Sequence, residues 1–224
     1  MIEEPARQDP LFPEERPSLT MVDVAYEAIL SGIVTHRFLG GQVLQEAKLA
    51  ATLNLSRTPV REALGRLEGE GLLQRDGRVL TVRSVTIKDY LEVLHLRRLL
   101  ETEAATLAAG NLEAEALLAL RARVAALTDP KAITPADHWQ LDEDIHLTIA
   151  RGSGNDHLVQ LIIDLRRMTR LFNLKKVPGR FFPGRDEHLE LIDALLAGDA
   201  PRAAEAMRSH IDNVKKGILE ALAL

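Results

Sequence analysis

The chain of 224 residues contains no cysteine, which excludes disulfide bonds and metal sites built on thiolates. Aromatic residues make up only 4% of the chain although 46% of it is hydrophobic, a balance typical of helices that pack through leucine and alanine. No apolar run approaches the length that crosses a bilayer, and the N-terminus lacks the basic-then-apolar pattern of a signal peptide. We therefore expect a cytoplasmic protein with no membrane partner.

Excess positive charge is also missing, since the formal net charge is −5 at pH 7. Residues 18–86 carry eight basic and seven acidic side chains, whereas residues 1–17 and residues 87–224 each have a net charge of −3. Without a broad positive field, non-specific attraction to nucleic acid is weak. Any affinity for DNA must therefore come from a few well-placed arginines.

Helical periodicity dominates the chain and predicts a mainly α protein in three parts. Residues 1–17 hold four of the ten prolines and little apolar content, so we expect a flexible arm. Residues 18–86 form one domain and residues 87–224 another, whose helical pattern breaks at Pro178-Gly179 and Pro183-Gly184. The second domain is expected to be an antiparallel bundle of about six helices. Its predicted helices are Ile87–Ala109, Ala114–Leu127, Ala136–Ala150, Asp156–Lys176, Arg185–Leu196 and Pro201–Leu222.

Two short helical patterns separated by a polar break lie in residues 46–72. The first covers Glu46–Leu53, and the second starts near Ser56 with Pro59 in its first turn, where a missing N–H costs nothing. Three polar side chains remain outside the apolar face at the start of the second helix, namely Arg57, Thr58 and Arg61. A recognition helix meets DNA with this end, so the pattern predicts a helix-turn-helix. The plainer alternative is a helical hairpin with a solvated basic face.

The flanking segments favour the DNA-binding interpretation. Two short β-like runs surround Asp76-Gly77, and such a pair is a strong signal for a tight hairpin. An amphipathic helix over Met21–Val34 precedes the helix-turn-helix. A helix, a helix-turn-helix and a hairpin together make a winged helix. The hairpin adds three arginines suited to phosphates or a narrow minor groove, namely Arg75, Arg78 and Arg83.

The stretch SGIVTHRFLGGQVLQEAKLAATLNLSRTPVREALGRLEGEGLL resembles the DNA-binding domain of the GntR family of bacterial transcription regulators. The resemblance implies that five residues contact the DNA, namely Ser56, Arg57, Thr58, Arg61 and Gly77. Gly77 would let the wing tip approach the backbone, and Ser56 would cap the helix, contact a phosphate, or do both. Two positions depart from the family: Gly40-Gly41 replaces the usual Pro-Gly, and Ala47 replaces an arginine that contacts DNA in one member.

Three of the seven histidines and one aspartate lie beside apolar helix faces in the second domain. Asp142 and His146 are four residues apart on one predicted helix, so their side chains share a face. His188 and His210 lie next to apolar residues on two later helices. Imidazole and carboxylate ligands with a free position suit Zn²⁺, Ni²⁺, Mn²⁺ or Fe²⁺. Spacing alone leaves open that each histidine is an ordinary boundary residue of the core.

The segments LHLRRLLETEAATLAAGN, DEDIHLTIARGSGN and DEHLELIDALLAGDAPRAAEAMRSHI resemble the helical FCD effector domain of the FadR-type branch of the same family. The resemblance implies a divalent metal held by an Asp-x-x-x-His pair and two later histidines, here Asp142, His146, His188 and His210. Zinc is the ion expected in the purified protein. The resemblance also implies a small carboxylate or hydroxy acid that completes the coordination sphere, with Arg97 as its clamp. A helix-surface pair between Arg97 and Glu101 is the alternative.

Other polar residues of the second domain receive structural interpretations. Asn155 is expected to cap the helix that follows it. Three further histidines are expected to be structural or surface residues, namely His95, His138 and His157. Three arginines of one helix are expected to form a solvated face, namely Arg166, Arg167 and Arg170, and the alternative is that one of them reaches the effector pocket.

Together these patterns predict a sequence-specific DNA-binding transcription regulator that is not an enzyme. A homodimer is expected, because one winged helix covers only a half-site and a palindromic operator mirrors the two-fold symmetry of the protein. We expect a repressor of a catabolic operon that a small organic acid at the metal releases or modulates. One alternative is a metal sensor in which the ion itself is the signal. The other is a helical metalloenzyme with a nucleic-acid-binding domain, since three histidines and an aspartate also suit a metal that activates water.

Overall fold

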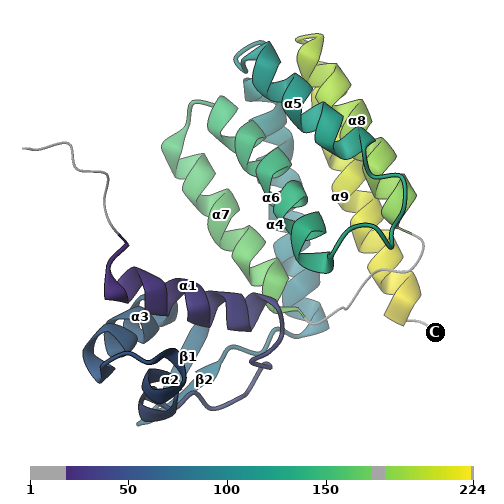
Figure 1. Ribbon diagram of the computed structural model, residues 1–224. Helices are drawn as coiled ribbons and strands as arrows, with labels where there is room; N and C mark the ends of the chain where they lie inside the picture. The colour runs from purple at the N-terminus through teal and green to yellow at the C-terminus, as the bar shows by residue number, and fades with distance from the viewer. Residues whose placement is uncertain (1–18, 173–179, 223–224) are drawn as a thin grey trace, which may run out of the picture.

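The computed structural model describes residues 19–172 and 180–222. Over these residues a winged helix-turn-helix is followed by an all-helical antiparallel bundle (Figure 1), which confirms the predicted, mainly α fold class. The arm predicted for residues 1–17 lies outside the described part of the chain.

The winged helix comprises α1 (Met21–Val34), α2 (Glu46–Leu53), α3 (Arg57–Gly69), β1 (Leu73–Asp76) and β2 (Val79–Val82). A capping box starts α1, because the Thr20 hydroxyl accepts from the Asp23 amide while the Asp23 carboxylate accepts from the Thr20 amide. Asn54 ends α2 in the left-handed conformation, with φ of 54°. The apolar face of α3 is buried against α1 and α2, which sends its polar face outward.

The predicted hairpin is confirmed as the wing. β1 and β2 are antiparallel and pair Asp76 with Val79, so a two-residue turn joins them. Gly77 occupies the first turn position with φ of +57°, a conformation that glycine adopts without a steric penalty. The amide of Leu44 donates to the carbonyl of Leu80 at 2.9 Å, which ties the wing to the segment between α1 and α2.

The bundle comprises α4 (Ile87–Ala108), α5 (Ala114–Ala125), α6 (Pro135–Gly152), α7 (Asp156–Leu171), α8 (Phe181–Leu196) and α9 (Ala200–Leu222). Its core consists mainly of leucine, isoleucine and alanine, with a few other apolar side chains and a small group of buried polar ones. The break predicted at Pro183-Gly184 is wrong, because α8 begins at Phe181 and places Pro183 in its first turn, where no N–H is needed. The last predicted residues of the fourth helix, up to Lys176, fall largely in the segment that is not described. None of the described helices has the length and apolar character of a membrane span.

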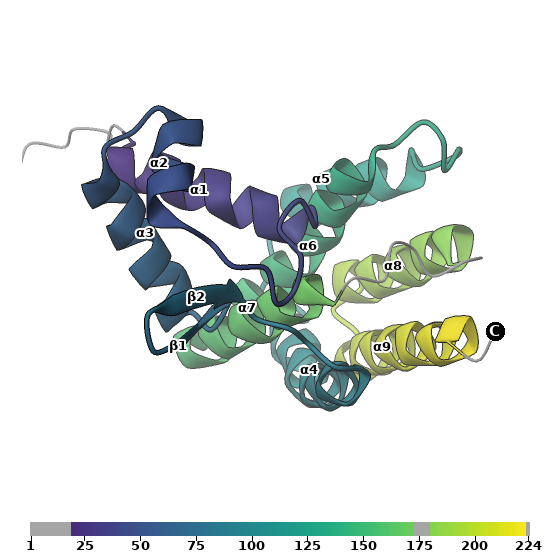
Figure 2. The same ribbon diagram turned by 90° about the horizontal axis from the view of Figure 1, so that it is seen from below.

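The two parts touch through α7 and the connecting segment. α7 packs against α1, and Leu171 at its end is buried in the core of the winged helix. Val85, between the wing and α4, packs against both hydrophobic cores. In the view from below, α7 lies between the winged helix and α4 (Figure 2).

Candidate metal centre and nucleic-acid interface

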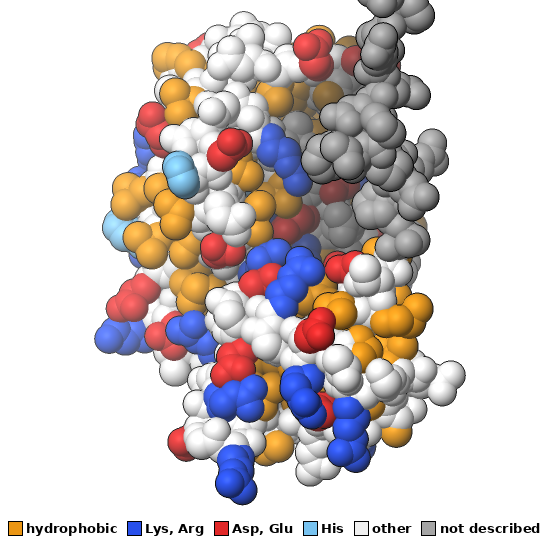
Figure 3. All heavy atoms as spheres, turned by 90° about the vertical axis from the view of Figure 1, so that its left-hand side faces the viewer, with side chains coloured by type: hydrophobic (Ala, Val, Ile, Leu, Met, Phe, Trp, Pro, Cys, Tyr) orange, Lys and Arg blue, Asp and Glu red, His pale blue; other side chains and the backbone are white. Residues whose placement is uncertain are grey.

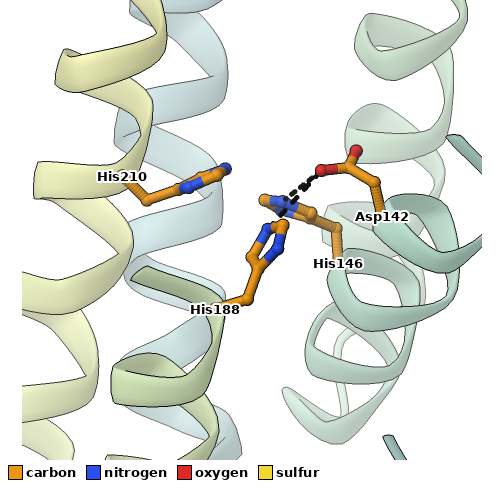
Figure 4. Close-up of side chains that lie close together, drawn as sticks. All are labelled: Asp142, His146, His188 and His210. Atoms are coloured by element: carbon orange, nitrogen blue, oxygen red, sulfur yellow. Dashed lines mark ion pairs between the residues drawn. The ribbon is translucent and has the colours of Figure 1, made fainter. Parts of the chain in front are cut away.

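Four side chains from three helices converge in the middle of the bundle (Figure 4). α6 supplies Asp142 and His146, α8 supplies His188, and α9 supplies His210. One potential ligand atom from each residue can be chosen so that all lie within 4.8 Å of one another. Oδ1 of Asp142 is 3.7 Å from Nε2 of His146 and 3.5 Å from Nε2 of His188. The four residues named from the sequence are therefore brought together in space.

Helical periodicity explains why these side chains point inward. On α6, His146 lies between Ile145 and Ile149 on a face that is buried against the rest of the bundle, and only 1% of His146 is exposed. Asp142 lies one turn earlier on that face. His188 and His210 are 7% and 4% exposed, and each lies one turn from buried apolar residues of its own helix.

Two glutamates fix the orientation of two of the imidazoles. Nδ1 of His146 is hydrogen-bonded to Oε2 of Glu101, and Nδ1 of His210 lies 2.9 Å from Oε2 of Glu187. Glu187 is itself held by both terminal nitrogens of Arg180. A carboxylate on Nδ1 leaves Nε2 free to face the cluster and makes it a better electron donor.

The cluster has unsatisfied polar atoms that fit a cation. Nε2 of His146 and Nε2 of His188 are buried and have no hydrogen-bond partner within the described ranges. Leaving a buried polar atom unpaired costs about 1–3 kcal/mol. Ligands at about 2.0–2.2 Å from one zinc ion lie a little over 3 Å apart, close to the 3.5 and 3.7 Å separations observed here. The residues present therefore fit a divalent metal ion.

The protonation states of the cluster also suit a metal. Burial, together with the positive charge of Arg166, lowers the pKa of His146 to about 4, and burial with the neighbouring His210 holds the pKa of His188 well below its usual value. Burial alone would raise the pKa of Asp142, but the Arg166 guanidinium lowers it well below its usual value. At neutral pH His146 and His188 are thus neutral imidazoles and Asp142 is an ionised carboxylate, the forms that bind metals.

The predicted effector residue Arg97 lies behind His146 and is 7% exposed. Its Nε donates to Oε1 of Glu101 at 2.5 Å, and its Nη1 lies 3.5 Å from the hydroxyl of Thr169. The alternative pair with Glu101 thus exists, although it is buried rather than on the helix surface. Burial favours the neutral form of Glu101, yet the guanidinium of Arg97 and the contact with His146 hold its pKa below the usual value.

The solvated face predicted for Arg166, Arg167 and Arg170 is wrong for Arg166. This side chain is only 2% exposed, and it donates from Nη2 to Asp142 at 2.6 Å and from Nε to Glu143 at 3.0 Å. The sequence did carry a signal, because Arg166 continues the buried stripe of α7 formed by Leu158 and Ile162.

The remaining structural interpretations of the second domain agree with the structure. The Asn155 side chain accepts from the Leu158 amide and caps α7 as predicted. His95 and His157 are exposed, whereas His138 is half-buried with its ring 5.7 Å from the ring of Phe181. None of these three histidines belongs to the cluster.

The five predicted DNA contacts lie on the exposed surface of the winged helix, four at the start of α3 and Gly77 at the wing tip. Ser56 occupies the N-cap position of α3, but its side chain makes no capping hydrogen bond, which leaves the hydroxyl available. Arg61 is held by two hydrogen bonds of 2.8 Å from its guanidinium to Glu46 at the start of α2. A groove between this pair and the wing is lined by Arg61, Arg75 and Arg78.

The surface of the winged helix is mixed in charge. In Figure 3 the lower half of the visible face carries Lys and Arg side chains interspersed with Asp and Glu. Arg75 pairs with Glu68, and Arg66 pairs with Glu70. This agrees with the near-zero charge of residues 18–86 and leaves recognition to individual arginines.

Comparison with known families matches both parts of the chain. The model of bacterial regulatory proteins of the gntR family matches residues 22–82, and the FCD domain model matches residues 92–213, more than half of the chain. The chain is 30% identical over 235 residues to the Glc operon transcriptional activator of Escherichia coli (strain K12), covering 92% of this chain and 90% of that protein. It is 29% identical over 201 residues to the probable D-xylose utilization operon transcriptional repressor of Paenarthrobacter nicotinovorans, covering 86% of each.

Solved structures show the same fold. The structure of E. coli McbR/YncC covers 91% of this chain and 100% of its own, with a TM-score of 0.76 at 21% identity. The named relatives above are transcriptional regulators and not enzymes, so the metalloenzyme alternative is set aside. The chain belongs to the GntR family, in the FadR-type branch with an FCD domain, and is a DNA-binding transcription regulator.

Proposed function

We propose that this protein is a repressor whose operator binding is modulated by a small carboxylate held at a divalent metal ion in the bundle. Residues 18–86 bind the operator, and residues 87–224 bind the metal and the acid and form the dimer. The observation that carries the proposal is the pair of buried, unpartnered Nε2 atoms of His146 and His188 beside the Asp142 carboxylate. An ion of the Zn²⁺, Ni²⁺, Mn²⁺ or Fe²⁺ class satisfies these atoms together with His210.

The apolar surroundings of the cluster support an anionic effector. A carboxylate that enters a core lined by leucine and isoleucine loses its hydration, which is costly unless its charge is met there. A bound divalent ion supplies that charge and takes a carboxylate oxygen as a further ligand. Arg97 is proposed as the second anchor, since its guanidinium reaches the same buried region through Glu101 and His146.

The operator is proposed to be palindromic and the protein a homodimer. Ser56, Arg57, Thr58 and Arg61 present hydroxyls and guanidiniums at the start of α3, and Gly77 allows the wing to approach a phosphate. Adjacent helices α4 and α7 expose three large leucines that support a face for a second copy. These are Leu96, Leu99 and Leu161, at 46%, 50% and 53% exposure.

The metal can be tested by removing one ligand. His210→Ala is expected to lose the ion and to lower the melting temperature, because an ion that binds only the folded state stabilises it. The difference from wild type should be much smaller after treatment of both proteins with chelator. Native mass spectrometry with elemental analysis, on protein purified without a chelating resin, reports the ion and the subunit number together.

His157→Ala is the matched control, because His157 is exposed and lies away from the cluster. This control should keep both the ion and the melting temperature of the wild type. Equal metal content in His210→Ala and wild type would show that the proposed site is wrong.

The effector can be tested by calorimetry with a panel of mono- and dicarboxylates. At least one acid should bind the metal-loaded protein and bind the chelator-treated protein poorly. Coupling between sites of this kind is usually about five- to hundredfold in affinity, so operator binding should weaken by that factor.

Arg97→Leu should reduce the affinity for the acid while the metal content stays unchanged. Arg97→Lys keeps a positive charge beside Glu101, so it serves as the control for loss of folding in Arg97→Leu.

Acid binding that is indifferent to metal loading would sink this mechanism and leave the metal-sensing alternative. The relatives include an activator and a probable repressor, so the direction of regulation has to be measured. The measurement is the expression of a reporter gene placed downstream of the selected operator, with and without the acid. The proposal expects higher expression when the acid is added.

A further inference from the structure

Two neighbouring arginines of α7 reach into different parts of the protein. Arg166 is buried in the bundle, whereas the side chain of Arg167 is 26% exposed and its Nη1 lies 3.4 Å from Oε2 of Glu70. Adjacent residues of a helix point about 100° apart, so one helix can present one side chain to each part. α7 is thus attached to both the bundle and the winged helix.

The bundle end of this attachment shares a carboxylate with the metal cluster. Nη2 of Arg166 holds Oδ2 of Asp142 at 2.6 Å, while Oδ1 of the same carboxylate faces the histidines. Nη1 of Arg166 lies 3.7 Å from Glu101, which holds His146, and has no hydrogen-bond partner in the described part of the chain. Any change in the charge of the cluster would therefore act on the Arg166 guanidinium at close range.

The other end holds the recognition helix. Glu70 is the C-cap residue of α3, and it accepts hydrogen bonds from the Tyr26 hydroxyl of α1 at 2.6 Å and from Nε of Arg66 at 3.2 Å. Arg167 adds α7 to this junction. Leu171, one turn further along α7, is 7% exposed and packs in the core of the winged helix. The C-terminal half of α7 is therefore docked where α1 and α3 meet (Figure 2).

We propose that α7 couples occupancy of the Asp142 cluster to the position of α3, with Arg166 as the sensing end and Arg167 as the transmitting end. This inference rests on the metal site proposed above. A cation beside Asp142 competes with Arg166 for the carboxylate and repels the Arg166 guanidinium. Both effects weaken the ion pair between Arg166 and Asp142 and shift Arg166 toward Glu143. Because a helix moves as a stiff unit, a displacement at Arg166 is carried to Arg167 and its contact with Glu70.

A double-mutant cycle tests the link without any ion. Asp142→Asn removes the charge that holds Arg166 and keeps the shape of the side chain, and Arg167→Gln removes the contact with Glu70. The DNA probe is the duplex that the wild-type protein selects from a random-sequence library. In chelator-treated protein, Asp142→Asn is expected to change the affinity for this duplex about threefold or more when Arg167 is present. In the Arg167→Gln background the same change should have an effect of less than about twofold.

Arg202→Gln is the matched control background, since it breaks an ion pair with Glu190 between α8 and α9, far from the winged helix in sequence and packing. It should leave the effect of Asp142→Asn intact. An equal effect of Asp142→Asn in the wild-type and Arg167→Gln backgrounds, or no effect in either, would overturn the link.

If Asp142→Asn does not fold, zinc titration of the wild type and of Arg167→Gln replaces it. The readout is then amide hydrogen exchange of residues 62–72, and an equal response in both proteins, or no response in either, would overturn the link. Metal content is measured separately, so a wild type without bound metal would overturn the proposed metal site and leave the ion-free cycle to decide the link.

Discussion

Replacing Arg166 by methionine is expected to lower the free energy of unfolding by about 3–5 kcal/mol, measured by chemical denaturation of chelator-treated protein. The guanidinium is 2% exposed and pairs with Asp142 and Glu143. Methionine fills much of the space but leaves the Asp142 carboxylate without its nearest positive charge. A buried charge that loses its partner destabilises the fold far more than the intact pair stabilises it.

Two further variants separate charge from packing at this position. Arg123→Met removes a half-exposed arginine that pairs with Asp144, and it should change the stability little because such pairs are screened by solvent. Adding Asp142→Asn to Arg166→Met should recover a large part of the loss, because the unpaired carboxylate is gone. A loss below about 1 kcal/mol for Arg166→Met would show that the buried network has little energetic role.

Helices and the hairpin could be predicted from the sequence wherever a few neighbouring residues determine the local structure. The bounds predicted for α1 and α2 agree with the structure, because capping residues and apolar spacing act over a few residues. The Asp76-Gly77 pair located the wing for the same reason. Pro183-Gly184 misled the prediction, since a proline is equally compatible with a break and with a first turn.

The metal cluster was only partly predictable from its residues. The i and i+4 relation places Asp142 and His146 on one face without further information. The approach of His188 and His210 to α6 depends on how α8 and α9 are placed in the bundle. No spacing along the chain specifies that placement, and it was expected from the family resemblance alone. The same limit applies to Glu187, whose contact with His210 crosses from α8 to α9.

Arg166 was missed for a different reason. Its position on the apolar stripe of α7 could be read from the sequence. Because arginine is seldom fully buried, however, a solvated face was preferred and a side chain that reaches the pocket remained the alternative. Only the packed structure shows that carboxylates of α6 meet it inside the bundle. A charged residue on the buried face of a predicted helix is therefore better interpreted as one member of a buried ion pair, even when the sequence does not identify its partner.

Arg61→Ala is expected to weaken binding to the selected operator about five- to hundredfold while the fold and subunit number stay unchanged. The Arg61 side chain is 70% exposed, so its removal costs no core packing. Glu46, which now receives both hydrogen bonds, would remain as an uncompensated negative charge at the DNA surface and add to the loss. Fluorescence anisotropy with the labelled operator measures the affinity, and circular dichroism checks the fold.

Matched variants and salt dependence show what Arg61 contacts. Arg37→Ala removes an exposed arginine elsewhere on the winged helix and should have a smaller effect. If Arg61 reads a base, Arg61→Lys should restore little of the affinity, because lysine lacks the planar fork that pairs with guanine. If it contacts a phosphate, Arg61→Lys should restore most of the affinity, and Arg61→Ala should reduce the salt slope by about 1. Wild-type affinity in Arg61→Ala at every salt concentration would remove Arg61 from the recognition surface and leave the other four predicted contacts, Ser56, Arg57, Thr58 and Gly77, as candidates.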